Sequence, residues 1–94
     1  MSEATVDVAS TLRARLSALQ PQVLEIRDDS AAHAGHAGAA AGGRHFSVLI
    51  VSEVFAGLSR LKRHEQVYRH VGDLLPHPVH ALSIKALAPQ ELPS

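Results

Sequence analysis

The chain has 94 residues, nine basic and nine acidic side chains, seven histidines and no cysteine. Its length predicts a single domain over residues 1–94, and its balanced charge excludes the overall positive field that draws a protein to nucleic acid or an anionic membrane. No apolar stretch approaches the roughly 18 residues of a membrane span, and no basic start with an apolar run marks a signal peptide, so we expect a soluble cytoplasmic protein.

The first quarter of the chain predicts a helix followed by a strand. Apolar residues recur at helical spacing over residues 4–19, and Pro21 ends that pattern. Over residues 23–27 apolar and charged side chains alternate, which is typical of a strand with one buried face. We therefore expect an amphipathic helix on one face of a sheet that contains this strand.

A loop over residues 28–44 is rich in Ala and Gly and holds two histidines, His33 and His36. Loops of this length without structure of their own are uncommon in compact domains, and they tend to be functional or disordered. Imidazole titrates near neutral pH and binds metal ions well. We therefore treat His33 and His36 as candidate metal ligands. The alternative is that they are exposed histidines that bind no ligand.

The second half of the chain predicts a strand, a helix and another strand. Residues 45–52 place large apolar side chains on both faces, which predicts a strand that is largely buried on both sides. Ser59 can cap a helix over residues 60–75, and the Pro-His-Pro that follows ends it. Residues 79–87 predict a third strand, and residues 89–92 a short last turn.

The large apolar residues of the 60–75 helix predict its inner face. They are Leu61, Tyr68, Val71 and Leu75, with Val67 and Leu74 alongside. The order α-β-β-α-β predicts a hairpin with a long loop, followed by a right-handed strand–helix–strand crossover. The expected fold class is α+β, a sandwich of a three-stranded mixed sheet with helices on one face.

His80 lies in a short apolar run, Val79-His80-Ala81-Leu82, at the start of the third predicted strand. A histidine that hydrogen-bonds to the backbone is the more common explanation of such a position, and a metal ligand is the alternative. His45, His70 and His77 have no special context, so we interpret them as surface residues.

Arg60, Lys62, Arg63 and His64 form a basic cluster at the start of the 60–75 helix. A solvated helix end is the common explanation, but positive charge at a helix N-terminus is mildly unfavourable, so binding to phosphates or to an acidic partner is the alternative. No nucleophile–base pair, paired carboxylate site or phosphate loop appears, and we expect no enzyme.

Several motifs in order resemble the BolA family over about residues 23–92. The run from His45 to Ser52, the pair Arg63-His64 and the run from Val79 to Leu82 resemble its central and C-terminal signatures. The segment from Asp28 to His36 resembles the branch of the family that has a histidine, rather than a cysteine, in this loop.

This resemblance implies a fold similar to a type II KH domain and a function in iron–sulfur trafficking and iron regulation. BolA-like proteins partner monothiol glutaredoxins and share a bridging [2Fe-2S] cluster, for which the glutaredoxin supplies one cysteine and its bound glutathione another. His80 matches the family's C-terminal histidine and is the first candidate ligand. His33 is the second, by its distance from Asp28, and His36 is the reserve.

The resemblance also implies an alternative function, since some members are described as DNA-binding transcriptional regulators of stress response and cell morphology. Here Glu65 follows His64 where a second Arg is common, which weakens the basic cluster and predicts weak DNA binding at most. A zinc site built from His33, His36 and His80 is a further alternative. Without its partner we expect a monomer or weak dimer that holds no cluster.

Overall fold

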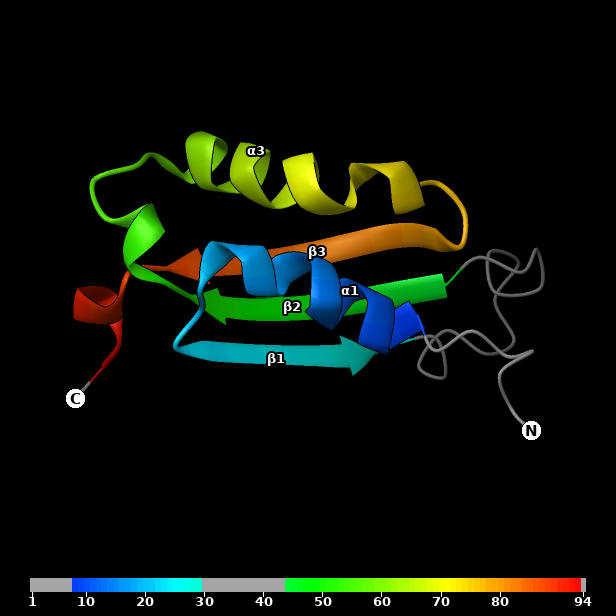
Figure 1. The fold of residues 1–94 in the computed structure, drawn as a ribbon, viewed down its shortest axis with the longest axis horizontal. Coiled ribbons are helices and arrows are strands. Elements are labelled where there is room, and N and C mark those ends of the chain that lie inside the picture. The colour runs from blue at the N-terminus through cyan, green and yellow to red at the C-terminus, as the bar shows by residue number, and fades with distance from the viewer. Residues whose placement is uncertain (1–7, 30–43, 94) are drawn as a thin grey trace.

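The computed structural model describes residues 8–29 and 44–93 (Figure 1). Its helices and strands follow the predicted order: α1 (Val8–Leu16), β1 (Val23–Asp28), β2 (Arg44–Val51), α3 (Arg60–Val71) and β3 (Val79–Leu87). Within these ranges both helices lie on one face of the sheet, which confirms the predicted α+β architecture. The predicted start of the first helix, at residue 4, and the loop residues 30–43 lie outside the described residues.

The sheet of the described residues has the order β1-β2-β3, with β1 antiparallel and β3 parallel to the central β2. The hairpin register runs from Val23 opposite Val51 to Asp28 opposite Phe46. A parallel pair needs a crossover connection, and α3 lies in it. The end of β1 and the starts of β2 and β3 therefore meet at one end of the sheet (Figure 1). No helix in the described ranges is long and apolar enough to cross a membrane.

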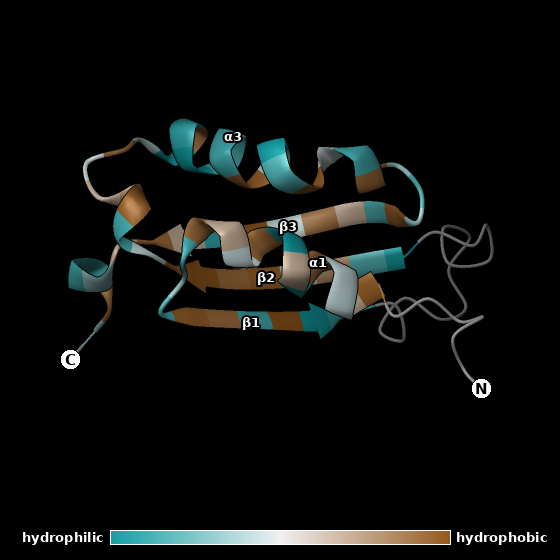
Figure 2. Ribbon diagram, viewed as in Figure 1, coloured by the Kyte–Doolittle hydropathy of each residue, from teal (hydrophilic) through white to brown (hydrophobic). Residues whose placement is uncertain are grey.

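The core lies between the helices and the covered face of the sheet. Its fully buried side chains are mostly aliphatic and include Leu12 and Leu16 of α1, Ile50 of β2 and Val79 of β3, together with Phe46 and Phe55. Figure 2 shows apolar residues along the strands and hydrophilic residues on the outer side of α3. Burial of each large apolar side chain contributes roughly 1.5–3 kcal/mol, so this layer is the main source of stability.

A buried hydroxyl ties the end of α1 to the end of β2. After α1, a short 3-10 turn (Ser17–Leu19) leads to Gln20, whose φ of 55° ends the helical run. Ser52, directly after β2, donates from Oγ to the Leu19 carbonyl at 2.6 Å and accepts from the Val54 N–H at 3.3 Å. Because Ser52 is only 1% exposed, these bonds also satisfy a hydroxyl that water does not reach.

The predicted inner face of α3 is wrong at two positions. Leu61 and Tyr68 are 67% and 39% exposed, whereas Val67 and Val71 are fully buried. Val67 and Val71 are four residues apart and share one helix face, from which Tyr68 is rotated by roughly 100°. The sheet packs against the compact valines, so side-chain size was a misleading guide. α3 also ends at Val71, and a 3-10 turn follows it in place of the predicted helix to residue 75.

No helix of the described residues covers the second face of the sheet, and the prediction that β2 is largely buried on both faces holds in part, since Val51 on this face is fully buried. Leu49 on this face is only half-buried. A groove of about 520 Å³ runs over the face and is lined by residues from the three strands, among them Glu25, Leu49 and Lys85. The physical reason is the two-layer architecture, which covers one side of the sheet and leaves the other to solvent.

Candidate metal-ligand site

His80, the first predicted ligand, is the second residue of β3, and its side chain is exposed. The parallel register pairs Arg44 with Val79 and His45 with Ala81, so His80 is an extra residue at an irregularity of the ladder. A bulge of this kind redirects a side chain at the end of a strand. The His80 ring therefore lies at the surface, at the end of the sheet where β2 and β3 begin.

The imidazole of His45 lies beside that of His80. The ring centroids are 5.4 Å apart, and the ring planes are inclined by 52°. His45 itself is half-buried. The interpretation of His45 as an ordinary surface residue is therefore wrong. Parallel pairing of the two predicted strands is the signal that could have revealed the contact, because parallel neighbours begin at the same end of a sheet. We call this end, marked by His45 and His80, the histidine end.

Acidic residues at the end of β1 hold the start of β2 in place. The Asp29 N–H donates to the His45 carbonyl at 2.7 Å, and the Asp28 carboxylate accepts from the Arg44 guanidinium at 2.6 Å. The Asp29 carboxylate also accepts a hydrogen bond from the Ser47 hydroxyl. These bonds fix the backbone of His45 beside the end of β1.

The predicted loop ligands, His33 and His36, lie outside the described residues. Within the described ranges, no group of three or more His, Cys, Asp or Glu side chains is placed to hold a metal ion. The histidine end thus presents two imidazoles, and imidazole is a ligand suited to Zn, Cu, Fe and Ni. Such a donor set makes a complete metal centre only with further ligands from outside the described residues or from a second molecule.

Arg63, from the predicted basic cluster, is largely withdrawn from solvent, with its side chain 12% exposed. Its guanidinium donates to the carbonyls of Leu58 and Ala86, at 2.9 and 3.0 Å, and to the Glu91 carboxylate at 2.6 and 2.7 Å. The Arg63 guanidinium and the Ala88 N–H lower the pKa of Glu91 to about 2. These bonds tie the start of α3 to the end of β3, and we call this part of the molecule, marked by Arg63 and Glu91, the arginine end.

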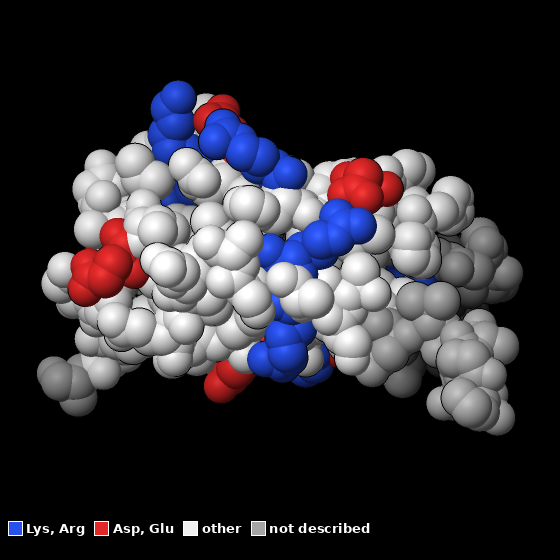
Figure 3. Space-filling model, in the orientation of Figure 1, with Lys and Arg blue, Asp and Glu red and all other residues white. Residues whose placement is uncertain are grey.

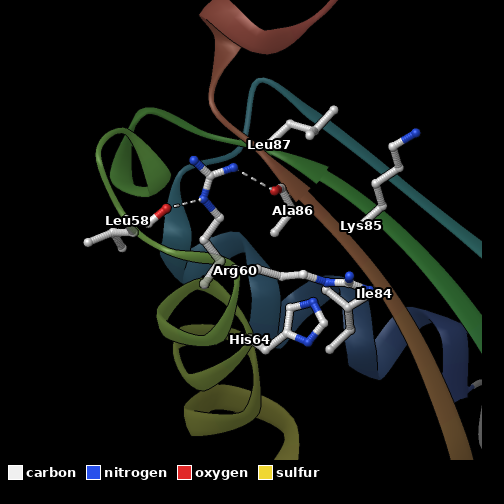
Figure 4. A pocket seen from close by; sticks show the side chains of 8 residues that line it. Leu58, Arg60, His64, Ile84, Lys85, Ala86 and Leu87 are labelled. Carbon is white, nitrogen blue, oxygen red and sulfur yellow. Dashed lines mark hydrogen bonds between the residues drawn. The ribbon is translucent and has the colours of Figure 1, made fainter.

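The rest of the basic cluster is more open. The Ser59 hydroxyl caps α3 as predicted, by accepting from the Lys62 N–H at 3.2 Å, and Lys62 Nζ lies 3.7 Å from Glu65. Arg60 and His64 line a cavity of about 570 Å³ between α3 and β3 (Figure 4). On the face shown in Figure 3, acidic side chains lie among the basic ones, so this face carries no continuous basic surface.

Comparison with known proteins identifies relatives along most of the chain. The profile of the BolA family, described as BolA-like protein, matches residues 16–91. Mouse BolA-like protein 1 is 43% identical over 91 residues, which cover 96% of this chain but only 64% of the mouse protein. The DNA-binding transcriptional regulator BolA of Haemophilus influenzae is 32% identical over 77% of this chain and 67% of that protein.

The fold leads to the same relatives. The solved BolA domain of SufE1 from Arabidopsis thaliana superposes with a TM-score of 0.78 and 40% sequence identity, over 92% of this chain and 96% of that domain. Sequence and three-dimensional structure thus agree, and the chain belongs to the BolA family.

Proposed function

We propose that this protein is an iron–sulfur partner protein that shares a bridging [2Fe-2S] cluster with a monothiol glutaredoxin. The observation that carries the proposal is the exposed imidazole at the histidine end of a chain without cysteine. A cluster normally takes four thiolates, but two histidines can replace two of them on one iron. Two histidines of this chain would therefore supply two of the four cluster ligands, and the glutaredoxin cysteine and its bound glutathione would supply the two thiolates.

His80 is the first ligand in this proposal, and a loop histidine is the second, with His33 ahead of His36. Chain length limits the distance between the Cα atoms of Asp29 and a residue four positions later to roughly 14 Å. Asp29 is itself bonded to the backbone of His45, whose ring lies beside that of His80. The connection from β1 thus starts close to the exposed imidazole, which supports His33 as its companion.

Imidazole ligands favour transfer or sensing over storage. Relative to thiolates they raise the reduction potential of a cluster, and protonation releases them from the metal. The contribution of this chain is to present nitrogen donors, one from β3 and one from the loop, as a binding partner and not as an enzyme. The likeness to the BolA domain of SufE1 supports an iron–sulfur-related role.

Co-expression with a monothiol glutaredoxin in the presence of glutathione tests the proposal. We expect a coloured complex whose visible absorption and circular dichroism bands change in His80→Ala. His77→Ala is the matched control, since His77 is an exposed histidine three residues earlier, in the turn before β3. We expect its spectrum to match that of the wild type. Identical spectra for the wild type and His80→Ala would contradict the ligand assignment.

A second candidate function is DNA binding, which the cavity lined by Arg60 and His64 and the name of the Haemophilus relative favour. Because Arg63 is bound to Glu91, phosphate contacts would rely on Arg60, Lys62 and His64. Such a small set gives weak, salt-sensitive binding. In a salt titration of DNA binding, Arg60→Gln should reduce the slope of log K against log salt concentration by about one, because one phosphate contact is lost. Absence of binding at low salt would contradict this candidate.

A further inference from the structure

The His45–His80 pair has a geometry that the proposed cluster role does not require. The two ring centroids lie 5.4 Å apart. Two imidazoles on one tetrahedral zinc ion, with Zn–N bonds of about 2.0–2.1 Å, place their ring centroids roughly 5 Å apart. The two rings thus have the spacing of a pair that shares one metal ion.

The sheet holds both donors firmly. His45 precedes Phe46 and His80 follows Val79, and both of these neighbours are buried in the core. The backbone carbonyl of His45 also accepts the hydrogen bond from Asp29. Ligands on strands keep their positions better than ligands on loops, so little ordering is needed when an ion binds.

An ion can reach the histidine end, and the charged side chains nearby are paired with one another. The His80 ring is exposed, so an ion can reach it from solvent. Arg44, the cation next to His45 in the sequence, is paired with Asp28 at 2.6 Å, which offsets its charge. Asp29 is likewise paired with Arg27 at 2.7 Å, so the charges around the start of β2 cancel and do not repel a cation.

We propose that His45 and His80 together bind one divalent transition-metal ion of borderline softness, such as Zn²⁺, in this chain alone. The site goes beyond the proposed function, because it needs neither a glutaredoxin nor a cluster. Two protein ligands leave the remaining positions to water or to a donor from another molecule, so the ion stays exchangeable. Since the ion occupies His80, it competes with a shared cluster for that imidazole.

The test uses Zn²⁺ as the probe on the full-length, metal-free protein near neutral pH. Calorimetric titration measures the affinity, and NMR of ¹⁵N-labelled imidazoles shows which rings bind. We expect one ion per chain and shifts of the His45 and His80 ring nitrogens together. Loss of a residue that only supports a metal ligand weakens metal affinity roughly 10–100-fold. We expect His45→Ala and His80→Ala each to weaken Zn²⁺ binding by at least that much. The double variant should be little weaker than either single variant, because the two residues act as a unit.

His77→Ala serves as the control for binding to any exposed histidine, and it should keep the wild-type affinity. The variant His33→Ala/His36→Ala should also bind Zn²⁺, which separates the pair from the loop. His45→Gln, checked by far-UV circular dichroism, should repeat the loss seen in His45→Ala without a change of fold. Wild-type Zn²⁺ affinity in the His45 variants would overturn the proposal.

This experiment is independent of the proposed function. It contains no glutaredoxin, so failure of the shared cluster to form leaves the Zn²⁺ result unchanged. Conversely, loss of cluster signal in His80→Ala, combined with unaltered Zn²⁺ binding in His45→Ala, would overturn the metal-ion pair and leave the cluster role standing.

Discussion

The two ends of the sheet use their polar side chains in different ways. At the arginine end, Arg63 bonds to backbone carbonyls and to Glu91, and the nearby Ser52 bonds to Leu19. At the histidine end, the exposed ring of His80 stands at a bulge. Groups whose hydrogen bonds are made inside the fold stabilise it, while an exposed imidazole remains available to a ligand. Basic residues at a helix start therefore do not by themselves mark a binding surface, and we place the proposed function at the opposite end.

The largest expected difference between the two ends is in stability. Phe55, in the 3-10 turn after β2, is fully buried, so Phe55→Ala should lower the free energy of unfolding by about 3–5 kcal/mol. His80→Ala removes an exposed side chain and should change it by no more than about 0.5 kcal/mol. Urea denaturation followed by far-UV circular dichroism measures both. Comparable losses in the two variants would contradict the different roles given to buried Phe55 and exposed His80.

A smaller effect is expected from the hydroxyl of Ser52. Ser52→Ala leaves the buried Leu19 carbonyl without this donor, which should cost about 1–3 kcal/mol of unfolding free energy. Ser83→Ala, at an exposed position in β3, is the matched control and should stay within about 0.5 kcal/mol of the wild type. Shifts of the urea midpoint compare the two, and equal shifts would show that the Ser52 bond contributes little.

Acid sensitivity is the third expected difference, and it belongs to the arginine end. The pKa of Glu91 is lowered from 4.5 to about 2, chiefly by its hydrogen bonds from Arg63. A carboxyl with a lowered folded-state pKa stabilises the fold above its unfolded value, and this stabilisation is lost as pH falls through the folded value. The wild type should therefore lose stability from pH 4.5 down to about 2, and Glu91→Gln should lose less over the same range.

Urea denaturation at each pH measures this effect as the stability difference between the wild type and Glu91→Gln. The difference should narrow as pH falls. Asp73, whose pKa is lowered by Arg15, titrates in both proteins, so the comparison isolates Glu91. A difference that stays constant through this range would mean that the Arg63–Glu91 pair does not stabilise the fold.

Local patterns were enough to predict the order of the elements and their mixed sheet. The alternation over residues 23–27 and the cap at Ser59 depend on neighbouring residues, so a single sequence shows them. The inner face of α3 was predicted less well. Leu61 and Val67 are both apolar, and the choice between them depends on how the helix packs against the sheet, which no local pattern records.

The contacts that distinguish the two ends join residues far apart in the chain. Arg63 and Glu91 are separated by 28 positions, and His45 meets His80 only through the parallel register of β2 and β3. In both pairs, the sequence around one residue gives no indication of the other. For this reason the predicted phosphate-binding cluster includes an arginine that is held inside the fold, and only the predicted parallel pairing of the two strands could have placed His45 beside the candidate ligand.

The central claim is that His80 supplies a nitrogen ligand to a cluster shared with a glutaredoxin. Pulsed EPR of the reduced complex tests it most directly, when only this chain carries ¹⁵N-labelled histidine. We expect strong ¹⁵N hyperfine coupling in the wild type and in His77→Ala, and its reduction or loss in His80→Ala. A wild-type complex whose cluster shows no coupling to histidine nitrogen, or coupling that is unchanged in His80→Ala, would contradict the claim.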